Sequence, residues 1–178
     1  MSFETSRLIF RRWQDEDKAP FSAMNSDHDV MEHFPTTLSR EESDVLIERI
    51  ESGFDKNGFG LWAVERKDNG AFIGFIGLGV PHLQAEFTPC VEIGWRLARG
   101  HWGRGFATEG AKKVLEVGFG DFDLEEIVSF TAKSNSKSIR VMERIGLKHT
   151  LDFDHPSLSP DSPLYAHVLY QIRRDKPC

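Results

Sequence analysis

Arg99-Gly-His-Trp-Gly-Arg-Gly-Phe-Ala-Thr108 is the stretch on which the interpretation of this chain depends. It follows an apolar, strand-like segment, Cys90–Leu97, and opens a segment, Phe106–Gly118, whose apolar residues recur at helical spacing. A helix start directs several backbone N–H groups, and the positive end of the helix dipole, at one point. Gly103 and Gly105 carry no side chain, so a phosphate can reach the main chain there. The stretch predicts an anion site, most simply for a pyrophosphate; the alternative is a glycine-rich structural turn.

The charge of the chain is distributed unevenly around this loop. Of 178 residues, 22 are Lys or Arg and 28 are Asp or Glu, which gives a formal net charge of −6. An acidic average argues against non-specific nucleic-acid binding. No acidic residue occurs between Glu92 and Glu109, whereas Arg96, Arg99 and Arg104 lie in that interval. The local positive charge supports an anion site, and no nucleic-acid partner is predicted.

A second glycine pattern, Gly74-Phe-Ile-Gly77-Leu-Gly79, competes for the phosphate-binding role. It lies inside an apolar strand-like run, it is followed by Pro81, and no helix begins after it. Strand glycines relieve packing or form bulges, so a structural role is preferred here. The loop at 99–108 fits neither a P-loop, because no Gly-Lys-Ser/Thr follows, nor a dinucleotide fingerprint, because Thr108 stands where the third glycine belongs.

The remaining segments predict one mixed α/β domain over residues 1–178. Ser39-Arg-Glu-Glu42 is a capping box for a helix, and Asp68-Asn69-Gly70 predicts a hairpin turn between two β-rich runs. The predicted strands are 8–13, 61–66, 72–80, 90–97, 127–132, 147–153 and 165–173, and the predicted helices are 15–26, 39–54, 106–118 and 135–145. The order β-α-α-β-β-β-α-β-α-β-β describes a mixed sheet in a single compact domain, and not a doubly wound nucleotide-binding fold.

Several classes of protein are excluded by composition. Two cysteines, Cys90 and Cys178, are too few for a disulfide scaffold or a four-cysteine zinc site, and no nearby base supports a cysteine nucleophile. The seven histidines form no pair with metal-binding spacing, so no metal is predicted. The chain has no apolar stretch of membrane-spanning length and no secretory signal at its start, which predicts a cytoplasmic protein without a membrane partner.

Three motifs in order resemble the GNAT family of N-acetyltransferases. They are Glu92-Ile-Gly-Trp-Arg-Leu97, Trp102-Gly-Arg-Gly-Phe-Ala-Thr-Glu109 and Asn135-Ser-Lys-Ser-Ile-Arg-Val-Met-Glu-Arg-Ile-Gly-Leu147. Within the family the chain is most similar to the RimJ/RimL ribosomal-protein N-acetyltransferases, and the resemblance covers nearly the whole chain. The expected strand and helix order of the family is the order derived above.

The resemblance implies acetyl-coenzyme A (acetyl-CoA) as co-substrate. The family's loop, Gln/Arg-x-x-Gly-x-Gly/Ala, corresponds to Trp102-x-x-Gly105-x-Ala107, with Trp102 in place of a polar residue. A strand that splays from its neighbour is expected to pair its main chain with the pantetheine arm, and one N–H there to polarise the thioester carbonyl. The implied cofactor-binding residues are Trp95, Arg96, Leu97, Trp102, Gly103, Arg104, Gly105, Phe106, Ala107, Thr108, Asn135 and Ser138. On chemistry alone, Asn135 is equally well explained as a helix N-cap.

The implied reaction is direct attack of a neutral amine on the acetyl thioester, which needs a proton acceptor and an acid for the leaving thiolate. In the RimJ/RimL-like pattern a serine at this position is placed near the sulfur, which makes Ser138 the candidate acid. Many other branches use a tyrosine instead, and the matching position here is Met142, which cannot donate a proton. Glu92 is the candidate base, directly or through water. For Ser138 a plain helix-surface serine remains the alternative, and for Glu92 a strand residue on a solvated face.

The acceptor is expected to be a primary amine, either a protein N-terminal α-amine or a small molecule, bound in a ternary complex. His33 and Phe34 lie where the family's acceptor pocket forms, and the Pro-rich loop near residue 160 is expected to border the same cleft. The net negative charge weakly favours a cationic acceptor, and a homodimer is compatible with the sequence. Two other classes remain open: a non-catalytic acyl-CoA-binding module and, less favoured, a nucleotide-binding oxidoreductase.

Overall fold

Eight strands form one sheet in the computed structural model, which describes residues 1–174. The strands are β1 (Phe3–Glu4), β2 (Leu8–Arg11), β3 (Leu61–Arg66), β4 (Phe72–Gly79), β5 (Glu92–Leu97), β6 (Glu126–Ala132), β7 (Lys148–Asp154) and β8 (Ala166–Arg173). Their order across the sheet is β1-β2-β3-β4-β5-β6-β8-β7. Every neighbouring pair in the described chain is antiparallel except β5 and β6, which are parallel. Cys178 lies outside the described residues.

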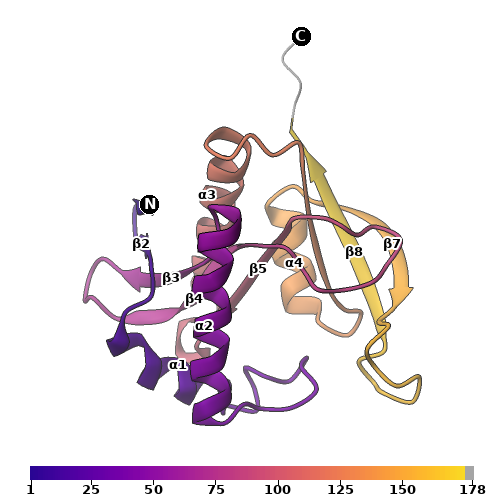
Figure 1. Cartoon of the computed structure of the whole chain (residues 1–178), viewed down its shortest axis with the longest axis horizontal. Helices are drawn as coiled ribbons and strands as arrows, with labels where there is room; N and C mark the ends of the chain where they lie inside the picture. Colours follow the sequence, from indigo (N-terminus) through magenta and orange to yellow (C-terminus); the bar gives the residue numbers. More distant parts are fainter. Residues whose placement is uncertain (175–178) are drawn as a thin grey trace.

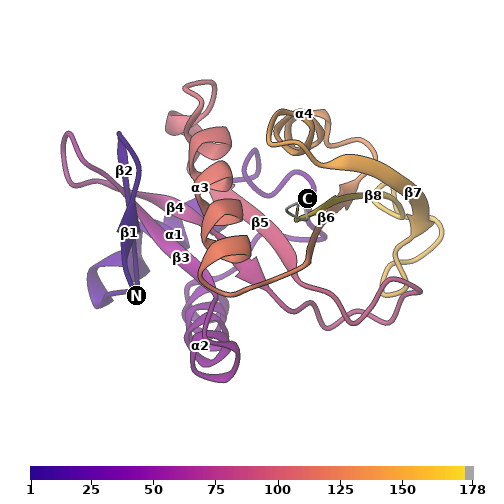
Figure 2. The ribbon, with the colours of Figure 1, turned by 90° about the horizontal axis from the view of Figure 1, so that it is seen from above.

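Four helices cover the two faces of the sheet (Figures 1 and 2). They are α1 (Lys18–Asn25), α2 (Arg40–Asn57), α3 (Phe106–Gly120) and α4 (Ser136–Arg144), with short 3-10 turns at Asp15–Asp17 and Arg99–His101. On β4, Phe75 contacts Phe21 of α1, whereas its neighbour Ile76 faces Gly110 of α3. Because side chains alternate along a strand, α1 and α2 lie on one face, and α3 and α4 lie on the other. The mixed α/β class predicted from the sequence is confirmed.

Local sequence explains where the elements begin and end. Ser39 caps α2: its hydroxyl accepts a hydrogen bond from the Glu42 amide, and the Glu42 carboxylate accepts one from the Ser39 amide, as a capping box requires. The helix continues three residues beyond the predicted end and stops at Gly58, which has a φ of 80°. The predicted hairpin between β3 and β4 is present.

Two elements at the N-terminal end differ from the sequence prediction. The predicted helix 15–26 is divided into a 3-10 turn and α1, and β1 was not predicted, because two residues are too short to show a β pattern. β1 pairs with β2 through Phe3 and Phe10, whose stacked rings lie 4.7 Å apart. The long-range aromatic contact stabilises a strand that local propensity does not specify.

The glycines of β4 have the structural role predicted for them. A Cβ atom at Gly77 would lie 2.2 Å from the backbone oxygen of Gly60, and one at Gly74 would lie 2.1 Å from that of Arg96. Gly74 also adopts a φ of 132°, beside a register shift between β3 and β4. These glycines therefore allow close approach of neighbouring strands and do not form a phosphate loop.

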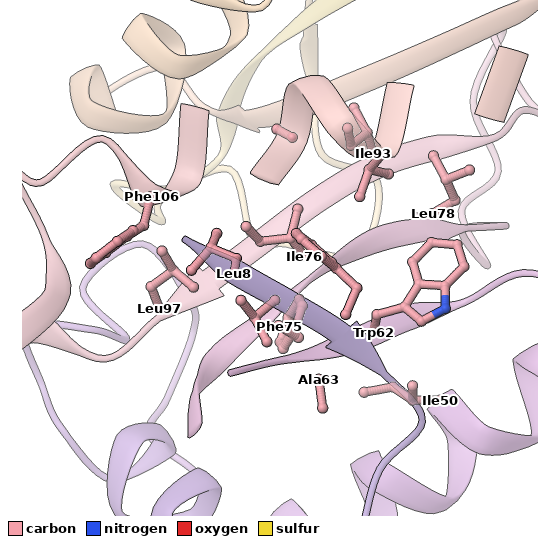
Figure 3. Close-up of a cluster of buried hydrophobic side chains, with 14 of the residues drawn as sticks. Leu8, Ile50, Trp62, Ala63, Phe75, Ile76, Leu78, Ile93, Leu97 and Phe106 are labelled. Atoms are coloured by element: carbon pink, nitrogen blue, oxygen red, sulfur yellow. The ribbon is translucent and has the colours of Figure 1, made fainter. Parts of the chain in front are cut away.

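The core lies on both faces of the sheet, between it and the helices, and part of it is shown in Figure 3. One part of the core lies between the sheet and α3. Leu8, Ile76 and Ile93 are fully buried there, and Gly110 of α3 sits against the Ile76 side chain. Close contact between α3 and the sheet fixes the position of the helix start. That start lies at the C-terminal end of β5, where the candidate site forms.

Candidate active site

The strands β5 and β6 diverge, and a cleft of about 910 Å³ opens where they part. They share a single register pair, Glu92 with Val128, beside a hydrogen bond from the Val128 amide to the Val91 carbonyl. Beyond that point β6, β8 and α4 stand apart from β5 (Figure 2). All of the site residues predicted from the sequence line this cleft except Arg104, whose side chain lies outside it.

The loop between β5 and α3 presents free backbone donors to the cleft. Gly103 and Gly105 have φ values of 72° and 78°, in the left-handed region that favours glycine. Gly105 is the N-cap of α3 and has no side chain to satisfy the helix amides. Within the described chain, the amides of residues 106–108 donate no hydrogen bond, whereas that of Glu109 bonds to the Gly105 carbonyl. Three free N–H groups at a helix start form a site for an anion.

Trp102 connects the loop to its surroundings, although the family usually has a polar residue there. Its indole N–H donates a hydrogen bond of 2.8 Å to the Leu97 carbonyl at the end of β5. The Lys137 ammonium lies 4.5 Å from the centre of the indole ring, so α4 contacts the loop across the cleft. Where the family pattern has a polar side chain, this chain has an indole whose hydrogen bond to Leu97 holds the loop against β5.

Arg104 contributes to the loop through its main chain. Its carbonyl accepts a hydrogen bond of 3.0 Å from Arg7, and the Arg7 guanidinium in turn pairs with Glu109 of α3. The Arg7 guanidinium lies 4.5 Å from the centre of the Phe106 ring. A residue from the start of the chain therefore supports the anion loop, and the Arg104 side chain is left exposed.

One edge of β5 carries unpaired main-chain groups along the cleft. The Ala98 amide bonds to Ile73 beside β4, and the Val91 carbonyl bonds toward β6. Successive residues of a strand direct their amides to opposite edges, so Trp95 and Leu97 direct theirs toward β6. The Leu97 carbonyl accepts the hydrogen bond from the Trp102 indole, and β6 is too far away to pair with Trp95. The N–H and C=O of Trp95 and the N–H of Leu97 thus face the cleft.

The start of α4 forms the opposite wall. Asn135 is the N-cap: its side-chain oxygen accepts a hydrogen bond from the Ser138 amide, and its side-chain nitrogen donates one to the Thr131 hydroxyl. The Ser138 hydroxyl, which is half-buried, makes no hydrogen bond to any described residue and is free to act in the cleft. Met142, one turn later, is buried with a side chain that cannot donate a proton.

Glu92 lies at the point where β5 and β6 part, on the sheet face that carries α1 and α2. Burial raises the pKa of its carboxyl from 4.5 to about 8. The carboxyl therefore changes its protonation state near pH 8. Burial, with the neighbouring Glu92 and Glu126, raises the pKa of the Cys90 thiol to about 11, which keeps it protonated and a poor nucleophile.

The loop between α1 and α2 closes the cleft on the same face. Phe34 is one of the few exposed large apolar side chains among the described residues, at 40%. His33 has a ring nitrogen 3.4 Å from the Ser134 hydroxyl, which belongs to the loop before α4. This contact joins the two walls of the cleft next to Asn135.

His155 and His167 also line the cleft and were not assigned to it from the sequence. Their rings lie 4.8 Å apart, between β8 and the Pro-rich loop, and burial lowers the pKa of both. Both imidazoles are consequently neutral at pH 7. The alternating pattern of β8 places His167 on this face, but its pairing with His155 depends on the path of the loop, which no local pattern specifies.

No helix between residues 1 and 174 is long and apolar enough to cross a membrane. No group of three or more His, Cys, Asp or Glu side chains in the same range could hold a metal ion.

The chain is similar to acetyltransferases in sequence and in structure. Residues 7–148 match a family model described as an acetyltransferase (GNAT) domain. The chain is 33% identical over 150 residues to the uncharacterized protein YkkB of Bacillus subtilis, covering 82% of this chain and 84% of YkkB. It is 29% identical over 147 residues to the uncharacterized N-acetyltransferase YoaA of the same species, covering 82% of this chain and 81% of YoaA.

A structural comparison extends this likeness. The structure of Mycobacterium smegmatis RimJ in complex with CoA-disulfide superimposes with a TM-score of 0.75 at 18% identity, covering 93% of this chain and 81% of RimJ. Fold, cleft and relatives together define the class of the protein, which is an N-acetyltransferase. The chain belongs to the GNAT acetyltransferase family, whose members take the acetyl group from acetyl-CoA.

Proposed function

We propose that this protein transfers the acetyl group of acetyl-CoA directly to a primary amine in a ternary complex, as the RimJ/RimL branch of the family does. One observation carries the proposal: the free amides at the start of α3 and the unpaired edge of β5 open into the same cleft. The first group suits the pyrophosphate, and the second suits the amides of the pantetheine arm.

The loop residues have distinct roles in holding the coenzyme. The amides of Phe106, Ala107 and Thr108 donate to the pyrophosphate, and the glycines at 103 and 105 keep the approach free of side chains. The main chain of Trp95 and Leu97 binds the pantetheine as an additional strand would. Asn135 and Ser138 line the opposite side of that arm. The exposed Arg104 guanidinium adds positive charge at the mouth.

The main chain of β5 also polarises the reacting bond. A free N–H at Trp95 donates to the thioester oxygen, which gains negative charge as the amine attacks. The amine nitrogen forms a C–N bond to the carbonyl carbon, and the C–S bond to coenzyme A then breaks. The amine loses one proton, and the thiolate gains one, so that the products are an N-acetylated amine and free coenzyme A.

Glu92 and Ser138 supply the proton transfers in this proposal. Glu92 in its ionised form accepts the amine proton, directly or through water, because its raised pKa matches the operating pH. Ser138 donates a hydrogen bond to the leaving sulfur, since its hydroxyl is free of protein partners in the described chain. Met142 is buried and apolar, so the tyrosine acid of other branches has no counterpart there.

The test combines binding and turnover. Calorimetry measures acetyl-CoA binding, and a thiol-release assay with mass spectrometry measures acetylation of N-terminal peptides and small amines. We expect acetyl-CoA to bind and at least one amine class to be acetylated. Binding without turnover on any amine would replace the proposal with a non-catalytic acyl-CoA-binding module, and the absence of acetyl-CoA binding would reject the site.

A further inference from the structure

Arg96 of β5 carries a positive charge that no acidic residue of the described chain neutralises. Its Nη1 donates a hydrogen bond of 2.8 Å to the side-chain oxygen of Asn25, which is a neutral partner. Its Nε is buried without any hydrogen-bond partner among the described atoms. A guanidinium in such surroundings normally pairs with a carboxylate or phosphate, because an uncompensated buried charge is costly.

The side chain of Arg96 lies on the sheet face that carries α1 and α2, away from α3. Arg96 pairs with Phe75 across β4 and β5, so both side chains share the face that carries α1 and α2. The guanidinium lies 4.1 Å from the centre of the Phe34 ring and 5.5 Å from that of Phe75. The two rings hold the guanidinium in the wall of the cleft, and Asn25 fixes its direction.

Asn25 is itself held in place. It is fully buried, and its side-chain nitrogen donates a hydrogen bond of 3.1 Å to the Ser43 hydroxyl of α2. The Ser43 hydroxyl in turn donates to the Ser39 carbonyl at 2.8 Å. The chain Ser39, Ser43, Asn25 and Arg96 therefore connects both N-terminal helices to β5 through neutral groups.

None of the three acidic residues that line the cleft in the described chain is paired with Arg96. Asp29 of the loop between α1 and α2 is ion-paired with Arg99. Glu32 lies beside His33, with 3.6 Å between the carboxylate and the ring. Glu92 is on the same strand face but four residues away, or roughly 13 Å along β5. Burial lowers the pKa of Arg96 only to about 10, so the guanidinium remains charged at neutral pH.

We infer that the acceptor is an amine that carries a carboxylate, and that Arg96 binds that carboxylate while the amine faces the thioester. This inference rests on the proposed acetyl transfer and names its substrate class. The second Nη of the guanidinium makes no hydrogen bond in the described chain, so it can donate a charge-assisted hydrogen bond to a carboxylate oxygen. The inferred acceptor, which carries a carboxylate, differs from the cationic acceptor that the net charge of −6 weakly favours.

The test uses matched acceptors that differ only in the carboxylate. Leucine, leucinamide and 3-methylbutylamine share one side chain, and corresponding sets built on other amino acids sample other pockets. We expect kcat/KM for the free acid to exceed that for the carboxamide by at least tenfold. Amine reactivity alone would favour the carboxamide, because its less basic amine is neutral to a larger extent at pH 7.

Two variants separate recognition from structure. Arg96→Gln removes the charge, and Asn25→Asp gives the guanidinium a carboxylate of its own. Both are expected to reduce the acid-to-carboxamide ratio to one or below while acetyl-CoA binding is unchanged. Arg173→Gln, an exposed arginine paired with Glu126 on the far end of β8, is the matched control and should keep the ratio. A merely structural Arg96 would lower both rates together and leave the ratio intact.

Each result decides the inference. Equal rates for acids and carboxamides in the wild-type protein, or an undiminished ratio in Arg96→Gln and Asn25→Asp, would overturn it. If acetyl-CoA binds but no amine is acetylated, the proposed transfer fails, and calorimetry of the same acids and carboxamides in the presence of coenzyme A then tests the subsite. Binding of acids that Arg96→Gln loses would support the subsite; no preference for acids would reject it.

Discussion

Replacing Glu92 with glutamine tests the buried carboxyl through both stability and activity. Burial raises its pKa from 4.5 to about 8 in the folded protein, so the folded state holds this proton more tightly than the unfolded chain. The contribution to stability is fully present below pH 4.5 and is lost as the pH rises through 8. At about 1.4 kcal/mol per pKa unit the full loss is roughly 4 to 5 kcal/mol.

Water in the open cleft reduces this figure, and we expect an observed difference of about 2 to 3 kcal/mol. Urea unfolding followed by tryptophan fluorescence at a series of pH values measures it. Wild-type stability should fall more steeply between pH 5 and 9 than that of Glu92→Gln, which cannot ionise. Glu48→Gln, at an exposed carboxyl on α2, should follow the wild type.

The same variant tests the role of the carboxyl as base. In the wild type, kcat/KM should rise with pH through about 8 as Glu92 loses its proton, and this limb should persist with acceptors of different amine pKa. Glu92→Gln should lose that limb and about 10²-fold or more in rate. If stability depends on pH in the same way in the wild type and in Glu92→Gln, the raised pKa of Glu92 is refuted. If the variant keeps the rise of kcat/KM with pH, the role of Glu92 as the base is refuted.

Three further changes test other parts of the site. Gly105→Asp places a negative side chain at the N-cap of α3, in a backbone with a φ of 78°. It should weaken coenzyme A binding at least tenfold in calorimetry, or about 1.4 kcal/mol, and Arg104→Glu should act in the same direction. Unchanged affinity in the folded variants would contradict the anion loop. Ser138→Ala should lower kcat while the acetyl-CoA dissociation constant changes less, and equal turnover would return Ser138 to the role of a helix-surface serine. Gly77→Ala should destabilise the fold by about 2 kcal/mol or more in urea unfolding, because its Cβ would lie 2.2 Å from the Gly60 carbonyl oxygen. A neutral effect would mean that β3 and β4 can move apart there at little cost.

Much of the fold and of the anion loop could be predicted because the signals are local. Backbone geometry is specified within a few residues at three places: the capping box at Ser39, the turn before Gly70, and the glycines at 103 and 105. In the structure the two loop glycines have positive φ, and the amides after them are free, as the strand–loop–helix context suggested.

The surroundings of Arg96, where we propose that the acceptor binds, could not be predicted because contacts between distant segments make their geometry. Arg96 was grouped with the cofactor loop, since it is close in sequence to Arg99 and Arg104. Its side chain instead contacts Asn25 and Phe34, about 60 to 70 residues earlier in the chain, and only the alternation of β5 together with the position of α1 shows this.

The role of Trp102 likewise needed the structure, because its hydrogen bond to Leu97 and its contact with Lys137 involve a strand end and a second helix. A family pattern identifies this position as an exception but does not say what replaces the missing polar group. The packing against β5 gives that answer.

The proposed activity of this cleft is transfer of acetyl groups from acetyl-CoA to an amine. The most direct measurement is mass spectrometry of the products formed when the protein is incubated with acetyl-CoA and a mixture of peptides and small amines, with coenzyme A release recorded in parallel. We expect N-acetylated products in a one-to-one ratio with released coenzyme A, and a smaller yield of both in Glu92→Gln. Tight acetyl-CoA binding with no acetylated product from any amine would contradict it.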